Sequence, residues 1–313
     1  MKVMQTVAEG SPEVLQEAKV DPPTPLPTEV LVSVRAAGVN AVDWKIRSGM
    51  FPPGALGRHP FVQGWDVAGV VESGPRVTRF APGDRVFGLI WFPRPGGGYG
   101  EMVTAPARQL ALMPKSLSFV EAAALPLAGL TAWQTLVSFA EVSAGDRVLV
   151  SAAGGGVGHL ATQIAAHGGT VVTGTARAEK HEFLRSCGVS VPVDYTTGPV
   201  SEQVGDQDVV LDLLGGEHSL DLVRCLRPGG LHILAIGVVQ PALQAAADEC
   251  GVRVVPFLVE PDGASLESLA DLVETGNLKV HVDRVFKLNE VAKAHEYGEA
   301  GRTTGKIVLH VAD

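Results

Sequence analysis

The spacing of apolar residues changes character near residue 120 of this 313-residue chain. Before that point, short runs rich in β-branched residues are separated by prolines and glycines, a pattern that predicts strands and turns. We expect strands at residues 2–7, 30–35, 69–72 and 85–89. The first part of the chain is therefore predicted to be mostly β.

After residue 120 the short apolar runs alternate with helical patterns. The expected strands are 148–151, 170–173, 191–193, 208–213, 231–236 and 252–258, and the expected helices between and after them include 160–166, 181–187, 219–226 and 266–275. Such alternation predicts a parallel sheet covered by helices on both faces. The tail (280–286, 290–300, 306–311) returns to strand, helix and strand, and we expect it to complete the first domain.

Length and composition support an α/β fold of two domains. We place the mostly-β domain at residues 1–121, completed by 279–313, and the parallel-sheet domain at 122–278. A charged content of 19% with 46% hydrophobic residues excludes a disordered chain. The net charge is −9, and the sequence has no stripe of basic residues, so no nucleic-acid partner is expected.

The compartment is inferred from apolar runs and cysteines. No run approaches the roughly 18 residues that a membrane span requires, so no membrane partner is expected. The start of the chain lacks the apolar core of a signal peptide. Three widely spaced cysteines (Cys187, Cys225 and Cys250) are typical of a reducing compartment, and we predict a cytoplasmic protein.

A glycine cluster joins one predicted strand to one predicted helix. The strand at 148–151 runs into Gly154, Gly155, Gly156, Val157 and Gly158, and a helix follows. Residues without side chains permit a tight turn and close approach of the backbone to a pyrophosphate, which the helix N-terminus attracts. The alternative is a glycine-rich turn that binds nothing. The strand before and the helix after the glycines favour a dinucleotide site.

The end of the next predicted strand indicates which dinucleotide binds. An NAD site usually has an acidic residue there for the ribose hydroxyls. This chain has Thr175 and then Arg177, with Lys180 one turn later. Glu179 is the competing acid, but it is expected in the first turn of the following helix. A guanidinium beside an ammonium suits a 2′-phosphate, so NADPH is predicted over NADH.

Several motifs resemble a known family along essentially the whole chain. They are Gly38-Val39-Asn40, Gly64-Trp65-Asp66, Pro82-Gly83-Asp84-Arg85-Val86, Gly129-Leu130-Thr131-Ala132 and Gly305-Lys306-Ile307-Val308. In this order they resemble the zinc-independent medium-chain dehydrogenase/reductases, especially quinone oxidoreductases of the zeta-crystallin kind. The resemblance implies a GroES-like catalytic domain, a Rossmann domain with a doubly wound parallel sheet, and a cleft between them for substrate and nicotinamide.

Zinc-dependent relatives differ from this chain at the ligand positions. The resemblance places Asn40 where they need a cysteine and Trp65 where they usually have a histidine, and no cysteine precedes Cys187. Asp43 and Asp66 are the nearest remaining candidates, which is too few for a tetrahedral site. No metal ligand is predicted.

The resemblance also implies roles for residues near the nicotinamide. Asn40 is expected to bind the substrate carbonyl or the cofactor ribose. Asp43 either orients the side of the site that faces the nicotinamide or caps the short helix through Ser48. Lys45 either stabilises developing negative charge or is simply exposed to solvent.

Further cofactor contacts follow from the same resemblance. We expect Thr131, at the opening of a helix, near the nicotinamide and Tyr195 beside the 2′-phosphate. Residues at or past the strand ends should line the sheet edge: Leu214, Ile236, Gly237 and Phe257. For the apolar residues of this group, ordinary core packing is the alternative.

The substrate is predicted to be a quinone or another conjugated carbonyl. Aromatic residues are candidates for its binding, although a folded core also uses such residues: Phe51, Trp65, Trp91 and Phe92. Quinone reductases of this family often have tyrosines where this chain has Lys45 and Phe51. A pathway-specific enoyl or enone reductase therefore remains an alternative, as does a cofactor-binding regulatory or structural protein with little turnover. The family resemblance also implies a homodimer, with edge pairing of residues 252–257 as the candidate contact.

Overall fold

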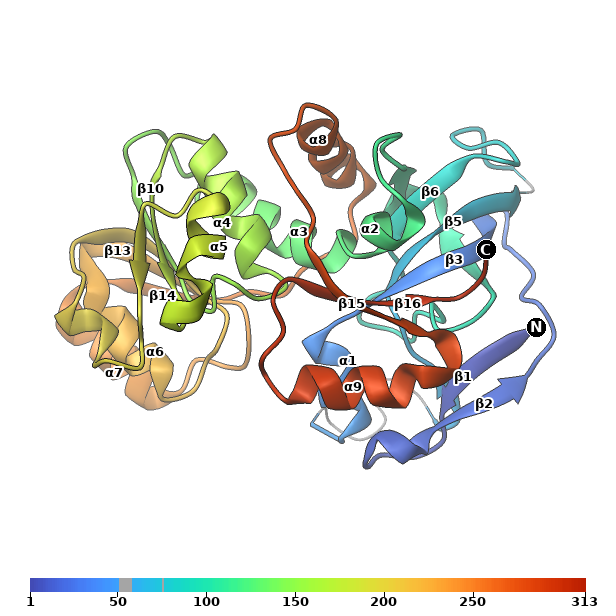
Figure 1. Ribbon diagram of the computed structural model, residues 1–313, viewed down its shortest axis with the longest axis horizontal. Coiled ribbons are helices and arrows are strands. Elements are labelled where there is room, and N and C mark those ends of the chain that lie inside the picture. The colour runs from blue at the N-terminus through green and yellow to red at the C-terminus, as the bar shows by residue number, and fades with distance from the viewer. Residues whose placement is uncertain (51–57, 75) are drawn as a thin grey trace. The chain divides into compact units, whose positions relative to one another are not determined.

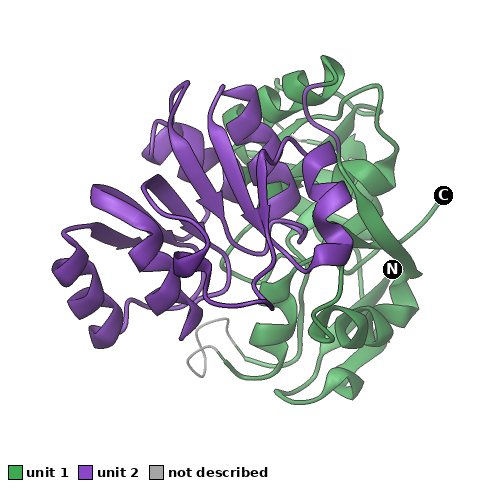
Figure 2. Cartoon of the chain, turned by 60° about the vertical axis from the view of Figure 1, so that its left-hand side comes forward, with its two compact units in different colours: residues 1–130, 260–276, 280–313 green, residues 131–259, 277–279 purple. Residues whose placement is uncertain are grey.

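The computed structural model describes residues 1–50, 58–74 and 76–313. Contacts divide the chain into two compact units, shown in Figure 2. Unit 1 comprises residues 1–130, 260–276 and 280–313, and unit 2 comprises 131–259 and 277–279. The first division thus falls at Leu130, whereas the sequence placed it at residue 121.

The segment 260–276 also differs from expectation, because it belongs to unit 1. Its helix α8 (Gly263–Glu274) begins against Arg108, in the short 3-10 helix after β7 (Met102–Pro106), and Leu110, the first residue of β8 (Leu110–Leu112). A Cβ on Gly263 would lie 2.6 Å from both of their carbonyl oxygens. The apolar face of a helix is visible in the sequence, but the core against which it packs is not.

Unit 1 is mostly β, as predicted (Figure 1). Its described strands are β1 (Lys2–Thr6), β2 (Leu15–Lys19), β3 (Glu29–Val39), β4 (Phe61–Val62), β5 (Asp66–Ser73), β6 (Arg85–Leu89), β7 (Met102–Pro106), β8 (Leu110–Leu112), β15 (Val282–Lys287) and β16 (Lys306–His310). They form a three-stranded sheet, β2-β1-β4, and a seven-stranded sheet, β15-β16-β3-β5-β6-β8 with β7 beside β3. The C-terminal strand β16 pairs antiparallel with β3, so Lys306 lies beside the end of β3.

Helices of unit 1 cover these sheets. They are α1 (Ala41–Arg47), α2 (Phe119–Ala123), α8 and α9 (Val291–Glu299), while α3 (Pro126–Trp133) runs across the division at Leu130. One core is built from valines of β3 and β5 with Phe80 and Ile90. Another packs Tyr99 and β16 against α9.

Unit 2 contains a six-stranded parallel sheet. Its strands are β9 (Arg147–Val150), β10 (Val171–Thr175), β11 (Val191–Val193), β12 (Gln207–Asp212), β13 (Leu226–Leu234) and β14 (Arg253–Pro256). Its helices are the π-helical segment η3 (Gln134–Phe139), α4 (Gly158–His167), α5 (His181–Ser186), α6 (His218–Leu222) and α7 (Pro241–Cys250). The spatial order β11-β10-β9-β12-β13-β14 is that of the doubly wound dinucleotide-binding fold.

Most predicted strands are confirmed to within a few residues, and β6 and β11 match their predicted bounds. The sequence analysis missed β2, β4, β7, β8, α2 and α7. It also placed Thr131 at the opening of a helix, which is wrong. The helix α3 begins at Pro126, because proline is well suited to a first helical position, and Thr131 lies near its end. No helix among the described residues is long and apolar enough to cross a membrane.

Candidate active site

The carboxyl ends of the parallel strands in unit 2 meet along one edge. Val150 at the end of β9 is in register with Gly174 of β10 and Leu211 of β12. The strand order reverses between β9 and β12, and ligands of such sheets bind outside the strand ends at that switch point. The glycine turn follows β9, so it lies at the switch point.

The glycine turn has the geometry of a phosphate cradle. Residues 151–157 form turns, and α4 begins at Gly158, two residues before the predicted start at residue 160. A Cβ on Gly158 would lie 2.3 Å from the Ala152 carbonyl oxygen, so this position excludes any side chain. The N–H groups of His159 and Ala161 donate to the carbonyls of Gly155 and Val157. An anion at the N-terminus of α4 would therefore meet the N–H groups that precede them, those of Gly156, Val157 and Gly158. The turn therefore fits the pyrophosphate of a dinucleotide.

Thr175 supports the turn from the neighbouring strand. Its hydroxyl oxygen accepts a hydrogen bond from the Ala152 N–H at 3.2 Å, and its carbonyl oxygen accepts one from the Ala153 N–H at 3.0 Å. Thr175 is buried. In this structure its side chain holds the shape of the turn.

Three predicted phosphate-binding residues come together beyond the ends of β10 and β11. Arg177 Nε donates a hydrogen bond to the Tyr195 hydroxyl at 3.2 Å. The Lys180 side chain lies against Gly154 of the glycine turn, because a Cβ on Gly154 would be 3.2 Å from Lys180 Cδ. Glu179 lies in the short 3-10 helix (Ala178–Lys180) that directly precedes α5, close to the position expected for it. The neighbouring Asp194 carboxylate accepts from the Thr196 hydroxyl and from the backbone N–H groups of Thr196 and Ala178, and these hydrogen bonds lower its pKa.

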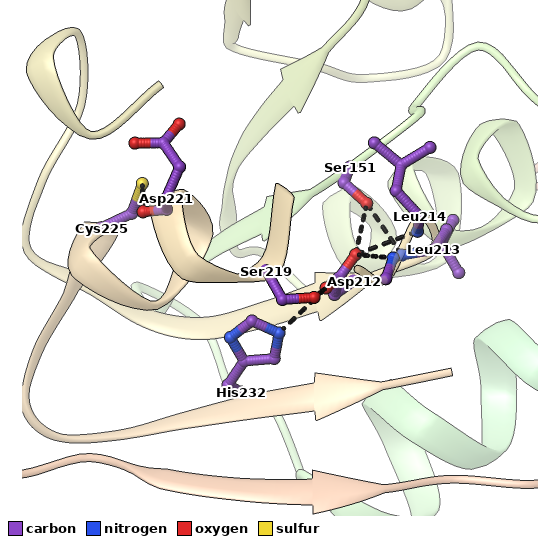
Figure 3. A network of polar contacts seen from close by, with 9 residues as sticks. Ser151, Asp212, Leu213, Leu214, Ser219, Asp221, Cys225 and His232 are labelled. Carbon is purple, nitrogen blue, oxygen red and sulfur yellow. Dashed lines mark hydrogen bonds and ion pairs between the residues drawn. The ribbon is translucent and has the colours of Figure 1, made fainter. Parts of the chain in front are cut away.

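A buried carboxylate organises the opposite side of the switch point (Figure 3). Asp212, the last residue of β12, accepts hydrogen bonds from the N–H groups of Leu214 and Gly215 at 2.9 and 3.0 Å. Ser219 Oγ donates to it at 2.5 Å, and His232 Nε2 lies 3.2 Å from it. Burial raises the pKa of Asp212, but these hydrogen bonds outweigh burial and hold it at about 2.

The Asp212 network also reaches the glycine turn. Ser151 Oγ accepts from the Leu213 N–H at 2.8 Å and lies 3.4 Å from Asp212 Oδ1. Figure 3 shows Ser151, Asp212 and Leu214 converging from two strand ends. Leu214 itself is 44% exposed, so it is available to a ligand at this edge.

Ile236, Gly237 and Phe257 follow the ends of β13 and β14, as expected. The Phe257 N–H donates to the Leu234 carbonyl at 2.8 Å. Gly237 has a φ of 91°, a conformation that favours glycine. A Cβ on Gly215 would lie 2.8 Å from the Ile236 carbonyl oxygen, so the loops after β12 and β13 are in close contact.

In unit 1, Asn40 lies in a buried polar cluster at the end of β3. Asn40 Nδ2 donates to Asp66 Oδ2 at 2.9 Å, and Lys306 Nζ donates to Asn40 Oδ1. Asp66 Oδ1 accepts from the Leu127 N–H at 2.8 Å, and Lys306 Nζ lies 3.4 Å from Asp66 Oδ2. Asp66 is fully buried, and Asn40 retains 6% exposure.

Asp43 has the capping role that the sequence analysis kept open. Its Oδ2 accepts from the Asn40 N–H at 2.6 Å and from the Tyr99 hydroxyl at 2.8 Å. Burial raises the pKa of Asp43 to about 7, against the opposing effect of these hydrogen bonds. The Tyr99 hydroxyl also lies 3.3 Å from His295 Nε2, and burial followed by the charge of Arg47 lowers the pKa of His295 to about 3.

The remaining predicted residues of unit 1 have different environments. Lys45 is half-buried, and this burial lowers its pKa. Trp65 is fully buried, donates to the Arg94 carbonyl at 2.6 Å and packs edge-on against buried Phe92. Trp91 donates to the Thr104 carbonyl at 2.6 Å and packs against the valine core. Core packing was the alternative for these aromatic residues, and it describes Trp65 and Phe92. Phe51 lies outside the described residues.

The residues at Asn40 do not fit a zinc ion. The described part of the chain has no group of three or more His, Cys, Asp or Glu side chains arranged to hold a metal. The acid that faces the Asn40 side chain, Asp66, already accepts hydrogen bonds from three donors. One of these is the Lys306 ammonium, whose charge would repel a second cation.

Sequence reasoning missed Lys306, Tyr99, His295 and Asp212 as parts of the site. Lys306 carried a usable signal, because a lysine that opens an apolar strand must be buried beside an acid or reach solvent. Asp212 carried a similar signal at the end of its apolar run. Neither signal names the partner, which comes from a distant part of the chain.

The parallel sheet with its glycine cradle and the mostly-β unit define a two-domain, dinucleotide-dependent oxidoreductase. Residues 26–115 match the family model of the alcohol dehydrogenase GroES-like domain, and residues 187–309 match that of a zinc-binding dehydrogenase. The chain belongs to the medium-chain dehydrogenase/reductase family, as its motifs indicated, and both predicted domain folds are confirmed.

Known proteins are similar over nearly the full chain. The 2-methylene-furan-3-one reductase of Solanum lycopersicum is 36% identical, over 99% of this chain and 79% of the relative. The chloroplastic NADPH-dependent alkenal/one oxidoreductase of Arabidopsis thaliana is 35% identical, over 96% and 77%. The structure of the quinone oxidoreductase from Coxiella burnetii superposes with a TM-score of 0.93, at 33% identity and 99% coverage of both chains.

Proposed function

We propose that this protein is an NADPH-dependent reductase that transfers hydride to a conjugated carbonyl compound, an enal, an enone or a quinone, without a metal ion. The observation that carries the proposal is the arginine–tyrosine pair at the ends of β10 and β11. Arg177 and Tyr195 stand where an NAD site usually has an acid, beside a glycine turn whose Gly154 lies against Lys180.

The named acceptors of the relatives support the reaction class. Alkenals, alkenones, a methylene-furanone and quinones share a carbonyl conjugated with a carbon–carbon double bond. Each of these systems accepts hydride and places the resulting negative charge on oxygen. A protein that reduces them must stabilise that oxygen and deliver a proton.

The residues of unit 2 fit the cofactor. The turn at Gly155, Gly156 and Val157 would hold the pyrophosphate, and Arg177 with Lys180 would hold the 2′-phosphate. The exposed Leu214 would pack against the nucleotide at the switch point. When bound, NADPH supplies the hydride, and the protein supplies its position.

The residues of unit 1 act on the acceptor. The Asn40 amide would donate a hydrogen bond to the carbonyl oxygen where negative charge develops. Lys45, half-buried with a lowered pKa, contributes positive charge on the same helix. The polar cluster at Asn40 does not suit a metal Lewis acid, because the Lys306 ammonium already fills it.

The proposal is tested by NADPH oxidation against a panel of enals, enones and quinones, in parallel with ethanol and other simple alcohols under NADP⁺. We expect turnover of the conjugated acceptors, no alcohol oxidation, and unchanged rates after dialysis against a zinc chelator. Tight NADPH binding with no turnover of any acceptor would instead support a cofactor-binding protein of regulatory or structural role.

The acceptor panel also tests a narrower function, that of an enone reductase in one pathway. Lys45 and Phe51 occupy positions where related quinone reductases often carry tyrosines, which removes phenolic donors for quinone oxygens. We expect kcat/KM for enones to exceed that for small quinones. Quinones that outperform every alkene acceptor would exclude this narrower function.

A further inference from the structure

We propose that Lys306 and Asp66 are positioning residues that hold the Asn40 amide in one orientation, with an N–H left for the carbonyl oxygen of the acceptor. This inference rests on the proposed function for its catalytic consequence. Its structural part stands on the described contacts of unit 1 alone.

The two hydrogen-bond partners of the Asn40 side chain determine which end of its amide is the oxygen and which is the nitrogen. An ammonium can only donate hydrogen bonds, so the atom that faces Lys306 Nζ must be the carbonyl oxygen Oδ1. The amide nitrogen Nδ2 then faces Asp66 Oδ2 at 2.9 Å. A flipped amide would place its NH₂ group against the ammonium and its oxygen against the carboxylate, and both contacts would be repulsive.

Asp66 acts as an ionised acceptor in this arrangement, although burial raises its pKa. Every neighbour that contacts its oxygens is a donor: Asn40 Nδ2, Lys306 Nζ and the Leu127 N–H. A proton on Asp66 would point at one of these donors. The ion pair of Asp66 and Lys306 is also held firmly. The two residues and their partners Asn40 and Leu127 come from three sheet strands or their ends and from the start of α3.

The backbone provides the space for this contact. Gly38 of β3 is in register with Asp66 of β5, and a Cβ on Gly38 would lie 2.9 Å from Asp66 Oδ2 and 2.4 Å from the Ala123 carbonyl oxygen. Lys306 enters from the other side of β3, on β16. The fold therefore places a fixed cation and a fixed anion on either side of the Asn40 amide.

The orientation has a chemical consequence. After the bonds to Asp66 and Lys306, Asn40 retains one Nδ2–H, and 6% of the residue is exposed. The ammonium at Oδ1 polarises the amide and makes that N–H a stronger donor. A donor that is fixed in advance stabilises a developing oxyanion without the cost of reorienting it.

The test is a double-mutant cycle between Asn40 and the ion pair. Asp66→Leu with Lys306→Met removes both charges together, which avoids leaving one buried charge without its partner. In the otherwise wild-type protein we expect kcat to fall about ten-fold or more, with KM for NADPH little changed. In the Asn40→Ala background the same pair of substitutions should change kcat by less than about two-fold, since the pair acts through Asn40.

An equal loss in both backgrounds would show that the ion pair only supports the fold, and no loss in the wild-type background would also overturn the inference. The control is Arg79→Met with Glu267→Leu, which removes an exposed ion pair of the same unit and should leave kcat unchanged. If the variant with Asp66→Leu and Lys306→Met does not fold, the variant with Asp66→Asn and Lys306→Met is used in its place. An amide at position 66 meets either end of Asn40, so the orientation is again undetermined and the same criterion applies.

A second readout needs neither cofactor nor turnover. In ¹H–¹⁵N spectra of the free protein, the Asn40 side-chain pair is the one that disappears in Asn40→Ala. We expect it to shift in the Asp66/Lys306 variants and not in the Arg79/Glu267 control. An unchanged Asn40 signal would refute the inference, whereas a wild-type protein that reduces no acceptor would refute only the proposed function.

Discussion

Arg177 Nε and the Tyr195 hydroxyl oxygen are 3.2 Å apart, at the ends of two adjacent parallel strands. Both side chains are exposed, and the hydrogen bond from the guanidinium leaves its other N–H groups for a ligand. This arrangement would suit a dianion such as the 2′-phosphate of the proposed cofactor. The residue that follows β10 in place of the usual acid is a cation, and the nearby Asp194 carboxylate already accepts from the N–H groups of Ala178 and Thr196.

Replacing Arg177 by alanine should therefore alter the choice of coenzyme. We expect KM for NADPH to rise about 10- to 100-fold, because a charge-assisted contact to the 2′-phosphate is lost, while KM for NADH changes little. Steady-state kinetics with both coenzymes measure this. Arg185→Ala, at an exposed position on α5, is the matched control, and an equal rise for NADPH and NADH would contradict the assignment.

Gly158 should not tolerate even a methyl group. Its Cβ would lie 2.3 Å from the Ala152 carbonyl oxygen, which belongs to the backbone and has little freedom to move. We expect Gly158→Ala to weaken NADPH binding at least about ten-fold by displacing the turn. Fluorescence titration measures the affinity, with Gly205→Ala as a control, since nothing lies within 4 Å of a Cβ at that position. Normal affinity in Gly158→Ala would show that the turn does not hold the pyrophosphate.

Asp43 should make the stability of the wild-type protein depend on pH. Its pKa is raised from 3.8 to about 7, chiefly by burial, so the folded state binds a proton that the unfolded state releases between these values. The contribution is fully present below about pH 4 and is lost as the pH rises through 7. Relative to Asp43→Asn, wild-type unfolding free energy should fall by up to about 4 kcal/mol over this range.

Urea unfolding of both proteins at pH 5 and pH 8 measures the effect of Asp43. The comparison with Asp43→Asn separates it from other groups that titrate over the same range. A difference between the two proteins that is the same at both pH values would mean that Asp43 is ionised throughout.

Replacing Asp212 should lower both the stability of the fold and the affinity for the cofactor. Its carboxylate accepts from Ser219, His232 and the N–H groups of Leu214 and Gly215, so an amide at this position would direct its own N–H at one of these donors. We expect Asp212→Asn to cost about 3 kcal/mol of unfolding free energy and to raise KM for NADPH several-fold. Its pKa of about 2 implies that the contribution is lost only as the pH falls from about 4 towards 2.

Urea unfolding and NADPH kinetics at pH 7 measure both effects of the Asp212 substitution. The control is Asp206→Asn, at an exposed residue with a φ of 55° that asparagine also adopts. Full stability with a normal KM in Asp212→Asn would mean that the loop after β12 does not depend on this carboxylate.

The sequence by itself determined the parallel-sheet unit and its cofactor cradle. The strand–glycine–helix order at Val150 to Gly158 and the arginine after β10 are local patterns, because a tight turn and a strand end are each made by consecutive residues. The same locality explains why β6 and β11 were predicted with their observed bounds. The predicted start of α3 was wrong for a different reason. Its local signal, a proline at the first helical position, was overlooked beside a family motif.

Only the tertiary structure decided which side chains meet. Lys306 and Asn40 are 266 positions apart, and their contact depends on β16 pairing with β3. Asp212 and Ser151 meet because β9 and β12 are neighbours at the switch point, and α8 joins unit 1 because its apolar face packs there. Residue spacing encodes how each element folds, whereas the pairing of distant elements depends on packing and charge summed over the whole chain.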